Sequence, residues 1–336
     1  LRVSPACETP LLARDITAAL AGNGPTLGFG EVSSEFGPSQ AAVVIGTSGT
    51  TGAPKEIFLS SHALVASARA SNAFVGAKLG DTWSLLLPLT HVAAVNVFVR
   101  AFELGTIPVD LRNHSGEYPR VNFTAIVPTQ LFRALNGDDQ LLKHLQGAQK
   151  VLVGGASLSS AIRNQATAAG INVVTTYGMS ETSGGCVYNG EILEGAEVEV
   201  RGGSIFIRGS VLALNLELSD GWFETNDLGE FVDEKLVVIG RSDDVIISGG
   251  ENLSLNSVEN ILSQSFPESQ FAAFSVEDPQ WGQTLHIAVV GEADSGSISS
   301  VLEEKVGAFA KPKGIHSLNS LPLLGIGKVD RKRLAQ

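Results

Sequence analysis

A run of hydroxyl-bearing residues and glycines occupies positions 47–55, directly after an apolar stretch, and ends in a lysine. Backbone N–H groups, side-chain hydroxyls and one cation together suit a polyphosphate. The run is not a Walker A loop, because the spacing GxxxxGK followed by Ser or Thr is absent. An ordinary Ser/Thr/Gly turn has the same composition, so both interpretations stay open here. The run reads Thr47, Ser48, Gly49, Thr50, Thr51, Gly52, Ala53, Pro54 and Lys55.

The run resembles the phosphate-loop signature of the adenylate-forming superfamily, which includes acyl-CoA synthetases, adenylation domains of peptide synthetases and firefly luciferase. Five further segments match the family in the correct order, and the match runs from about Val43 to Leu334. This joint order is far more specific than any single motif. The segments are Pro88-Leu89-Thr90-His91, Tyr177-Gly178-Met179-Ser180-Glu181-Thr182, Gly221-Trp222-Phe223-Glu224-Thr225-Asn226-Asp227, Gly240-Arg241-Ser242-Asp243-Asp244 and Gly325-Ile326-Gly327-Lys328-Val329-Asp330-Arg331.

The resemblance implies how ATP and Mg²⁺ would bind. Thr182 would touch the α-phosphate, and Glu181 would hold Mg²⁺, a hard cation that prefers oxygen ligands and bridges phosphates. Asp227 would accept hydrogen bonds from the ribose hydroxyls, with help from Arg241. The β- and γ-phosphates would lie on Thr47, Ser48, Thr50, Thr51 and Lys55, with Gly49 and Gly52 in the same loop. Adenine would pack between Gly154-Gly155-Ala156 and Tyr177, beside Gly178 and Met179.

The resemblance also assigns the catalytic roles. Negative charge builds on the attacking carboxylate and the α-phosphate during adenylation, and Lys328 would stabilise it. His91 would line the acyl pocket and gate entry of the second substrate; a cap of the following helix is its alternative role. Asp243 would be the hinge about which a small domain rotates. Gly249 and Gly250 would border the tunnel for the pantetheine arm of coenzyme A.

Two features depart from most relatives. Family members usually carry Gly or Ala after the loop lysine, whereas this chain has Glu56, whose charge is unfavourable near a polyphosphate unless it points away. Only 46 residues precede Thr47, so the first subdomain is much reduced. This compact layout resembles the short actinobacterial o-succinylbenzoate–CoA ligases of menaquinone biosynthesis, which implies o-succinylbenzoyl-CoA as the product.

The expected acyl pocket combines apolar walls with Gln and Ser/Thr, which suits a polar aromatic acid better than a long alkyl tail. Arg100 and Arg133 are candidates for the distal carboxylate of succinylbenzoate. The alternative function is a freestanding adenylation enzyme that loads another aryl or small acid onto coenzyme A or a carrier protein. The expected pocket residues are Val95, Phe98, Val127, Thr129, Gln130, Gly178, Ser183 and Gly184.

These residues need a scaffold, and the chain predicts one in positions 41–176. Short apolar runs alternate there with helix-like segments, which is typical of a doubly wound α/β sheet. Strands are predicted at Ala41–Gly46, Ser84–Leu87, Phe123–Val127, Lys150–Val153 and Asn172–Thr176, and helices at His62–Gly76, Val92–Leu104 and Ser159–Ala169.

After Gly190 the pattern changes to short β-prone segments with Gly or Asp turns, which predicts a small antiparallel sheet or barrel. Residues 242–250 are turn-rich and read as a linker. A mobile α+β domain should follow, with a helix capped by Asn256. We therefore expect a large domain over 1–241 and a small lid over 242–336 that carries Lys328. The β-prone segments are Glu197–Arg201, Ser204–Arg208, Gly229–Val232 and Leu236–Ile239; the small domain should hold strands near Gln270–Val276 and Leu285–Val290 and a helix near Ile298–Phe309.

Composition sets the remaining limits. The chain has 336 residues, 43% of them apolar and 17% charged, as in a folded protein with more than one domain. Its net charge of −12 argues against a nucleic-acid partner. Cys7 and Cys186 form no paired motif and read as reduced thiols. No apolar run is long enough to span a bilayer, so cytoplasm is the expected compartment, and a homodimer is one alternative for the assembly state.

Overall fold

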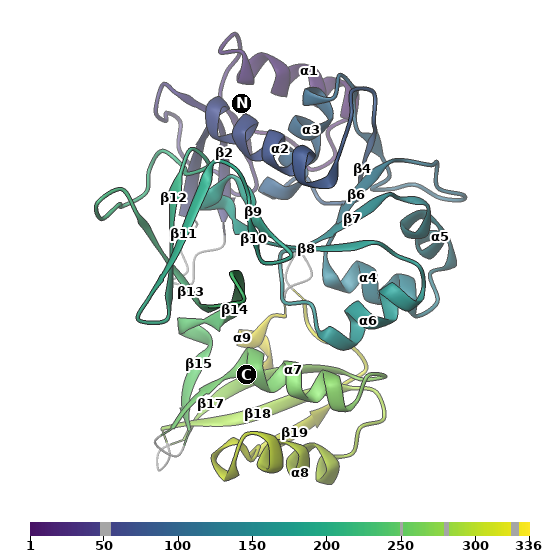
Figure 1. Ribbon diagram of the computed structural model, residues 1–336, viewed down its shortest axis with the longest axis vertical. Helices are drawn as coiled ribbons and strands as arrows, with labels where there is room; N and C mark the ends of the chain where they lie inside the picture. Colours follow the sequence, from purple (N-terminus) through teal and green to yellow (C-terminus); the bar gives the residue numbers. More distant parts are fainter. Residues whose placement is uncertain (48–54, 249–250, 279–281, 324–328) are drawn as a thin grey trace.

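The computed structural model describes residues 1–47, 55–248, 251–278, 282–323 and 329–336. Figure 1 shows a large upper part built on two sheets with helices, an antiparallel sheet beside it, and a smaller α+β domain below. This mixed α/β architecture confirms the predicted fold class.

A seven-stranded sheet forms the centre of the large part, in the order β10-β9-β8-β7-β6-β4-β5. Strands β5, β4, β6, β7 and β8 run parallel, and β9 and β10 are antiparallel. Its strands are β4 (Trp83–Leu85), β5 (Val109–Asp110), β6 (Phe123–Ile126), β7 (Lys150–Val153), β8 (Val173–Met179), β9 (Gly184–Tyr188) and β10 (Glu191–Ile192).

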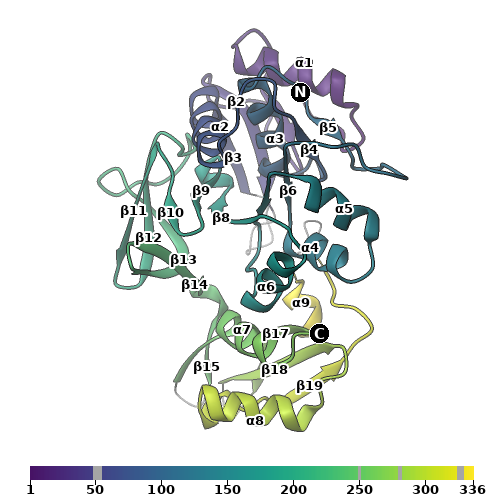
Figure 2. The same ribbon diagram turned by 45° about the vertical axis from the view of Figure 1, so that its right-hand side comes forward.

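Helices cover both faces of this sheet, as the doubly wound prediction requires (Figure 2). Leu152 packs into the cluster that holds α2 and α3, whereas its neighbours Val151 and Val153 pack into the cluster that holds α4, α5 and α6. This alternation follows from the two-residue period of a strand. The helices are α2 (Ser61–Val75), α3 (Val92–Glu103), α4 (Pro128–Leu135), α5 (Asp139–Gly147) and α6 (Ser160–Ala168).

A separate three-stranded sheet precedes the central one, and here the prediction was wrong. The strand expected at Ala41–Gly46 is β2 (Ala41–Thr47), which pairs with β1 (Leu27–Phe29) and β3 (Lys55–Ser60) instead of joining the doubly wound sheet. The unpredicted β3 comes directly after the 48–54 segment and pairs antiparallel with β2. Since β1 pairs with the other edge of β2, no edge is left for the doubly wound sheet. Helix α1 (Thr9–Leu20) packs on this sheet in the common core.

A four-stranded antiparallel sheet in the order β11-β12-β13-β14 confirms the change of pattern after Gly190. The turn between its last two strands places Asp233 and Glu234 at φ 48° and 63°, a left-handed conformation that suits a two-residue hairpin turn. The strands are β11 (Ala196–Arg201), β12 (Ser204–Gly209), β13 (Phe223–Val232) and β14 (Lys235–Arg241).

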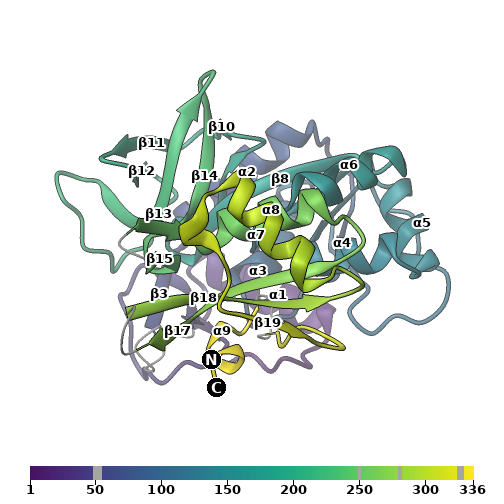
Figure 3. The same ribbon diagram turned by 90° about the horizontal axis from the view of Figure 1, so that it is seen from below.

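The small domain has its own core around a three-stranded sheet, β17-β18-β19. Figure 3, seen from below, shows α7 and α8 on one side of this sheet and α9 on the other. Its elements are η2 (Ser242–Asp244), β15 (Val245–Ser248), β16 (Glu251–Ser254), α7 (Leu255–Ser265), β17 (Gln270–Asp278), β18 (Gly282–Val290), α8 (Ser295–Lys305), η3 (Ala308–Ala310), β19 (Gly314–Ser317) and α9 (Arg331–Leu334).

Two predictions for this domain need correction. The cap of α7 is Ser254, whose side chain accepts a hydrogen bond from the Ser257 N–H, and not Asn256. Residues 242–250 are also more than a linker, because β15 begins at Val245 and pairs with β16. Ser254 is the N-cap because β16 ends at this residue and α7 begins at the next one.

The cysteines and the helix lengths can be compared with what the sequence predicts. Cys7 and Cys186 are both free thiols, and Cys186 is buried. None of the helices in the described ranges combines the length and apolarity required for a membrane crossing.

Candidate functional site

The ends of the 47–55 run lie opposite each other. Thr47 closes β2, Lys55 opens β3, and the two residues are register partners in the antiparallel pair. The Thr47 hydroxyl also donates to the Lys55 carbonyl oxygen at 3.0 Å. The predicted phosphate ligands Ser48, Gly49, Thr50, Thr51 and Gly52 lie outside the described residues. The structure thus fixes the base of the loop that would carry them.

The Lys55 ammonium reaches across to the other expected phosphate-site residue. Its Nζ lies 3.3 Å from Oε1 of Glu181, which belongs to the short helix η1 (Ser180–Thr182) after β8. The Glu181 side chain is 18% exposed and the Lys55 side chain is 54% exposed, so a ligand from solvent has access to the pair. A cation and a carboxylate that are 126 residues apart in the chain therefore meet at one point.

Glu56 points away from this pair, because successive side chains of a strand lie on opposite faces. Its Oε1 accepts hydrogen bonds from the Ser33 N–H at 2.6 Å, the Ser33 hydroxyl at 2.8 Å and the Ser34 N–H at 3.0 Å. Burial acts to raise the pKa of Glu56, but the hydrogen bonds from Ser34 and Ser33 outweigh it and lower the pKa to about 2. Glu56 is thus a structural anion and no obstacle to a polyphosphate.

The η1 turn is held by its own hydroxyl. Thr182 is fully buried, and its Oγ1 accepts from the Met179 N–H at 3.0 Å and donates to the Gly184 carbonyl oxygen at 2.7 Å. Gly178 lies so close to Gly184 that a Cβ on it would sit 2.1 Å from the Gly184 oxygen. The proposed contact of Thr182 with the α-phosphate stays a prediction.

Asn96 of α3 supports the same turn, and it was not among the predicted site residues. Its side chain is 1% exposed and its Nδ2 donates to the Ser183 carbonyl oxygen at 2.8 Å. Ser183 has a φ of 52°, and a Cβ on Gly184 would fall 1.9 Å from that same Nδ2. The one available signal was a lone amide within the apolar helix Val92–Glu103.

Tyr177, Asp227 and Arg241 form the second expected group. The Tyr177 hydroxyl donates to Oδ2 of Asp227 at 2.9 Å, and Oδ1 of Asp227 lies 3.9 Å from Nη1 of Arg241. Burial, followed by the nearby Asp227 charge, raises the pKa of Tyr177, so the phenol keeps its proton. The chain brings the three together because β8 meets the β13–β14 pair, in which Asp227 and Arg241 are register partners.

Gly154 and Gly155, which follow β7, lie next to the strand that carries Tyr177. A Cβ on Gly154 would lie 2.1 Å from the Thr176 hydroxyl, so the chain after β7 lies directly against β8, one residue before Tyr177. Gly155 (φ 84°) and Ala156 follow and are exposed. These residues lie at the carboxyl ends of parallel strands, where open α/β sheets bind ligands, and the adenine position between them and Tyr177 stays a prediction.

Of the remaining predicted residues, two lie in the part of the chain that the structure describes and three lie outside it. His91 occupies the N-cap position of α3 but makes no side-chain cap hydrogen bond, which disfavours the capping alternative. Asp243 lies within η2, at the start of the small domain. Lys328, Gly249 and Gly250 lie outside the described residues.

The two candidate arginines differ sharply. Arg133 is mostly exposed and forms an ion pair with Asp138 at 3.0 Å. Arg100 is 4% exposed, stacks over the Trp83 ring at 5.0 Å and donates to the Tyr188 hydroxyl at 3.1 Å. Its Nε is buried without a hydrogen-bond partner in the described parts of the chain. Arg100 is thus the buried cation of the two, and Arg133 the surface one.

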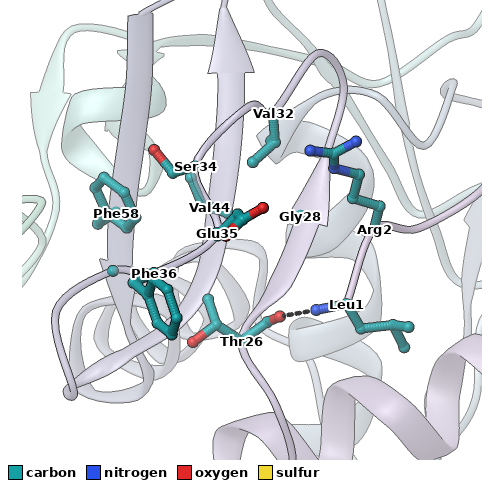
Figure 4. A pocket seen from close by; sticks show the side chains of 11 residues that line it. Leu1, Arg2, Thr26, Gly28, Val32, Ser34, Glu35, Phe36, Val44 and Phe58 are labelled. Carbon is teal, nitrogen blue, oxygen red and sulfur yellow. Dashed lines mark hydrogen bonds between the residues drawn. The ribbon is translucent and has the colours of Figure 1, made fainter.

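A pocket beside the N-terminal sheet lies apart from these groups (Figure 4). Its wall includes Arg2, Phe36 and Phe58, and the Leu1 amine donates to the Thr26 carbonyl oxygen at 2.7 Å. None of the expected nucleotide residues lines it.

Comparison with known proteins gives one family match and clear relatives. The family model described as AMP-binding enzyme matches residues 9–208. A protein of Mycobacterium tuberculosis named probable 2-succinylbenzoate–CoA ligase is 37% identical over 324 residues, which cover 88% of this chain and 84% of the relative. The 2-succinylbenzoate–CoA ligase of Listeria monocytogenes is 28% identical and covers 89% and 70%.

Solved structures share the fold. A variant of E. coli MenE with bound OSB-AMS superposes with a TM-score of 0.77 at 23% identity, covering 99% of this chain and 80% of that one. The o-succinylbenzoate CoA synthetase (MenE) of Bacillus subtilis, in complex with the acyl-adenylate intermediate OSB-AMP, gives 0.76 at 22% identity, with 97% and 81% covered.

Proposed function

This chain belongs to the family of AMP-binding enzymes, and on that premise we propose that it is an AMP-forming acid–CoA ligase whose acid is 2-succinylbenzoate. The activity class follows from the family and from relatives named as CoA ligases. One observation in the structure carries the proposal: Lys55–Glu181 and Tyr177–Asp227–Arg241 gather around β8 and η1. That arrangement offers separate places for polyphosphate and nucleoside.

The first half-reaction joins the acid to AMP. A carboxylate oxygen attacks the α-phosphorus of ATP, the bond to the β-phosphate oxygen breaks, and pyrophosphate leaves with the electron pair. Lys55 and the loop that it closes would bind the departing phosphates, and Asp227 would hold the ribose hydroxyls. The hydrogen bonds of the buried Thr182 hold the η1 turn in one conformation, so its backbone, if it lies beside the α-phosphate, would need little reorganisation in the transition state.

The donor set at Glu181 fits Mg²⁺. This ion keeps several waters and is commonly bound through one or two carboxylates together with substrate phosphates. Glu181 supplies one partly exposed carboxylate beside Lys55, and the phosphates of ATP would supply the rest. When bound, Mg²⁺ would neutralise charge on the phosphates. Glu181 would hold it, and Lys55 would then turn from Glu181 to the phosphate oxygens.

The second half-reaction transfers the acyl group. The thiol of coenzyme A loses its proton to solvent and attacks the acyl carbon, the bond to AMP breaks, and AMP leaves with the electron pair. We assign Lys328 to the first half-reaction, with the small domain rotating about Asp243 between the two. Gly249 and Gly250 would border the pantetheine arm, and His91, at the start of α3, would gate the acyl pocket.

Arg100 is our candidate for the distal carboxylate of the acid. It is a buried guanidinium, and the described residues place no carboxylate within ion-pair distance of it. A substrate anion would supply the missing charge, directly or through a water molecule. Because Arg133 already pairs with Asp138 at the surface, its replacement should leave the affinity for the acid unchanged.

Acid-dependent pyrophosphate exchange, measured over a panel of acids, tests this function. We expect 2-succinylbenzoate to exceed benzoate, acetate and palmitate in kcat/KM. A preference for any of those three would reject the acid but keep the activity class. Exchange with 2-succinylbenzoate but without thioester formation from free coenzyme A would instead favour the alternative, a carrier-protein loading enzyme.

Compartment and assembly are separate parts of the proposal. The free thiols Cys7 and Cys186 are compatible with the reducing cytoplasm, where ATP and coenzyme A are available. A homodimer is the alternative to a monomer, and light scattering of the purified chain distinguishes them.

A further inference from the structure

Arg331, the first residue of α9, contacts three other elements of the small domain: η2, α7 and β17. Its Nε donates to the Ala273 carbonyl oxygen at 2.9 Å, and Nη2 donates to Oε1 of Glu259 at 2.8 Å. Nη1 lies 3.3 Å from Oδ2 of Asp244, and Nη2 lies 3.4 Å from Oδ1 of Asn256. The side chain is 26% exposed, so these interactions are partly shielded from water.

Three of these groups close a ring. Oε1 of Glu259 accepts a hydrogen bond from the Ala273 N–H at 2.8 Å as well as one from Arg331. Since Arg331 also donates to the Ala273 carbonyl oxygen, the start of α9, helix α7 and strand β17 are joined at one point. Hydrogen bonds between charged partners are about twice as strong as neutral ones, so this junction is stiff.

The chain on either side of 324–328 is fastened to the same body. Leu323 and Val329 form an antiparallel bridge, and the Asp330 N–H donates to the Pro322 carbonyl oxygen at 2.9 Å. Val329 packs against the buried cluster around Phe274. Lys328 stands three positions before Arg331 in the sequence.

Asp244 connects this junction to the start of the small domain. The Ser242 hydroxyl donates to the Asn226 carbonyl oxygen of β13 at 3.2 Å, so Ser242 is attached to the large part. Asp244, two residues later, is attached to Arg331 of the small domain. The backbone of Asp243 is all that separates the two attachments.

We propose that Arg331 is a positioning residue for adenylation. By pairing with Asp244 and Glu259 it ties the small-domain side of the hinge and helix α7 to the start of α9, three positions after Lys328 in the sequence. Rotation about residue 243 would then carry η2, α7 and the start of α9 together, and the role that we assign to Lys328 would depend on Arg331. The inference rests on the proposed function, which gives Lys328 its role in the first half-reaction.

Two half-reactions measured separately on the full chain test this role. The variants are Arg331→Gln, Arg331→Lys and Asp244→Asn, with Arg333→Gln as the matched control, since Arg333 lies exposed on the same helix. Adenylation is measured as pyrophosphate exchange with 2-succinylbenzoate. Thioester formation is measured from supplied acyl-adenylate and coenzyme A, and thermal unfolding monitors the fold.

We expect Arg331→Gln to slow pyrophosphate exchange at least tenfold, because misplacing a reacting group by about 1 Å can cost on the order of 10²-fold. Thioester formation should change by less than about threefold, a small part of that effect. Arg331→Lys should recover part of the exchange rate, and Asp244→Asn should show the same pattern more weakly.

Equal losses in both half-reactions, or no loss in either, would overturn the positioning role. If Arg331→Gln does not fold, the Asp244→Asn variant decides by the same criterion. A wild-type chain without acid-dependent exchange would instead contradict the proposed function itself, so the two failures can be told apart.

Discussion

At the scale of single residues, neighbours on one strand carry opposite charges and separate tasks. Lys55 faces Glu181, whereas Glu56 faces the backbone of Ser33 and Ser34. From the sequence alone, the negative charge of Glu56 is expected to be unfavourable for phosphate binding by the preceding loop. The alternation of β3 turns it into an anchor for the segment between β1 and β2.

Glu56→Gln should therefore destabilise the fold with little effect on activity. Hydrogen bonds to a charged group contribute about 1.5–3 kcal/mol when fully formed, and we expect a loss of about 1–2 kcal/mol at pH 7 in this partly exposed site. The pKa of Glu56 is lowered from 4.5 to about 2. The stability it contributes is thus present above about pH 4.5 and disappears as the pH falls towards 2.

Urea unfolding of both proteins from pH 7 down to pH 3 measures this difference. Glu35→Gln is a suitable control, because Glu35 is exposed in the same segment. A difference in unfolding free energy that stays constant over that range would show that the carboxylate charge plays no part.

Much of the candidate site could be predicted residue by residue, because the residues that match the family motifs are those expected to contact the substrates. Tyr177, Asp227 and Arg241 come from three separate motifs and do meet in the structure. Asn96 could not be predicted, because its role depends on the spatial approach of α3 to the Ser183 carbonyl. No spacing in the sequence encodes that approach.

At the scale of elements, α3 supports the η1 turn from behind. Asn96→Ala would leave the buried Ser183 carbonyl oxygen without this donor, which should cost about 1–3 kcal/mol of unfolding free energy. The loosened turn also carries Glu181, so kcat/KM for ATP in pyrophosphate exchange should fall.

Asn164→Ala, on the exposed face of α6, is the matched control and should change stability by no more than about 0.5 kcal/mol. Unchanged stability and exchange in the Asn96 variant would show that the hydrogen bond does not support the turn.

Element positions followed the periodicity closely where helices and parallel strands alternate. β7 matches its predicted bounds, and α2, α3 and α6 differ from theirs by one residue at each end or less. The sheet membership of β2 was missed, because strand partners depend on which edge is free and not on local pattern. Helices α4 and α5 were not among the predicted helices, although α5 has nine residues, as many as the predicted α6.

At the scale of the whole molecule, the chain between the large body and the small domain passes through η2, and α7 also contacts β14 and α6. Ser242 is attached to the large body and Asp244 to the small domain. A domain rotation must then be absorbed by very few backbone angles. This places the proposed hinge at Asp243.

Asp243→Pro should trap one pose. Proline fixes φ near −65° and also restrains the preceding residue, Ser242. We expect acyl-adenylate to form in a burst and thioester formation to fall at least tenfold, roughly 1.4 kcal/mol or more in activation free energy. Rapid-quench analysis of both products measures this. Normal turnover with coenzyme A would show that residue 243 only links the domains.

The proposed activity, AMP-forming ligation of 2-succinylbenzoate to coenzyme A, is tested directly by a single incubation of the chain with 2-succinylbenzoate, ATP, Mg²⁺ and coenzyme A. The acyl-CoA is identified by mass spectrometry and the nucleotide by chromatography. We expect 2-succinylbenzoyl-CoA and AMP in equal amounts, and a rate lower by about 10²–10³-fold in Lys328→Ala, since one preorganised cation is lost. Formation of ADP in place of AMP, or the absence of the thioester, would contradict the account.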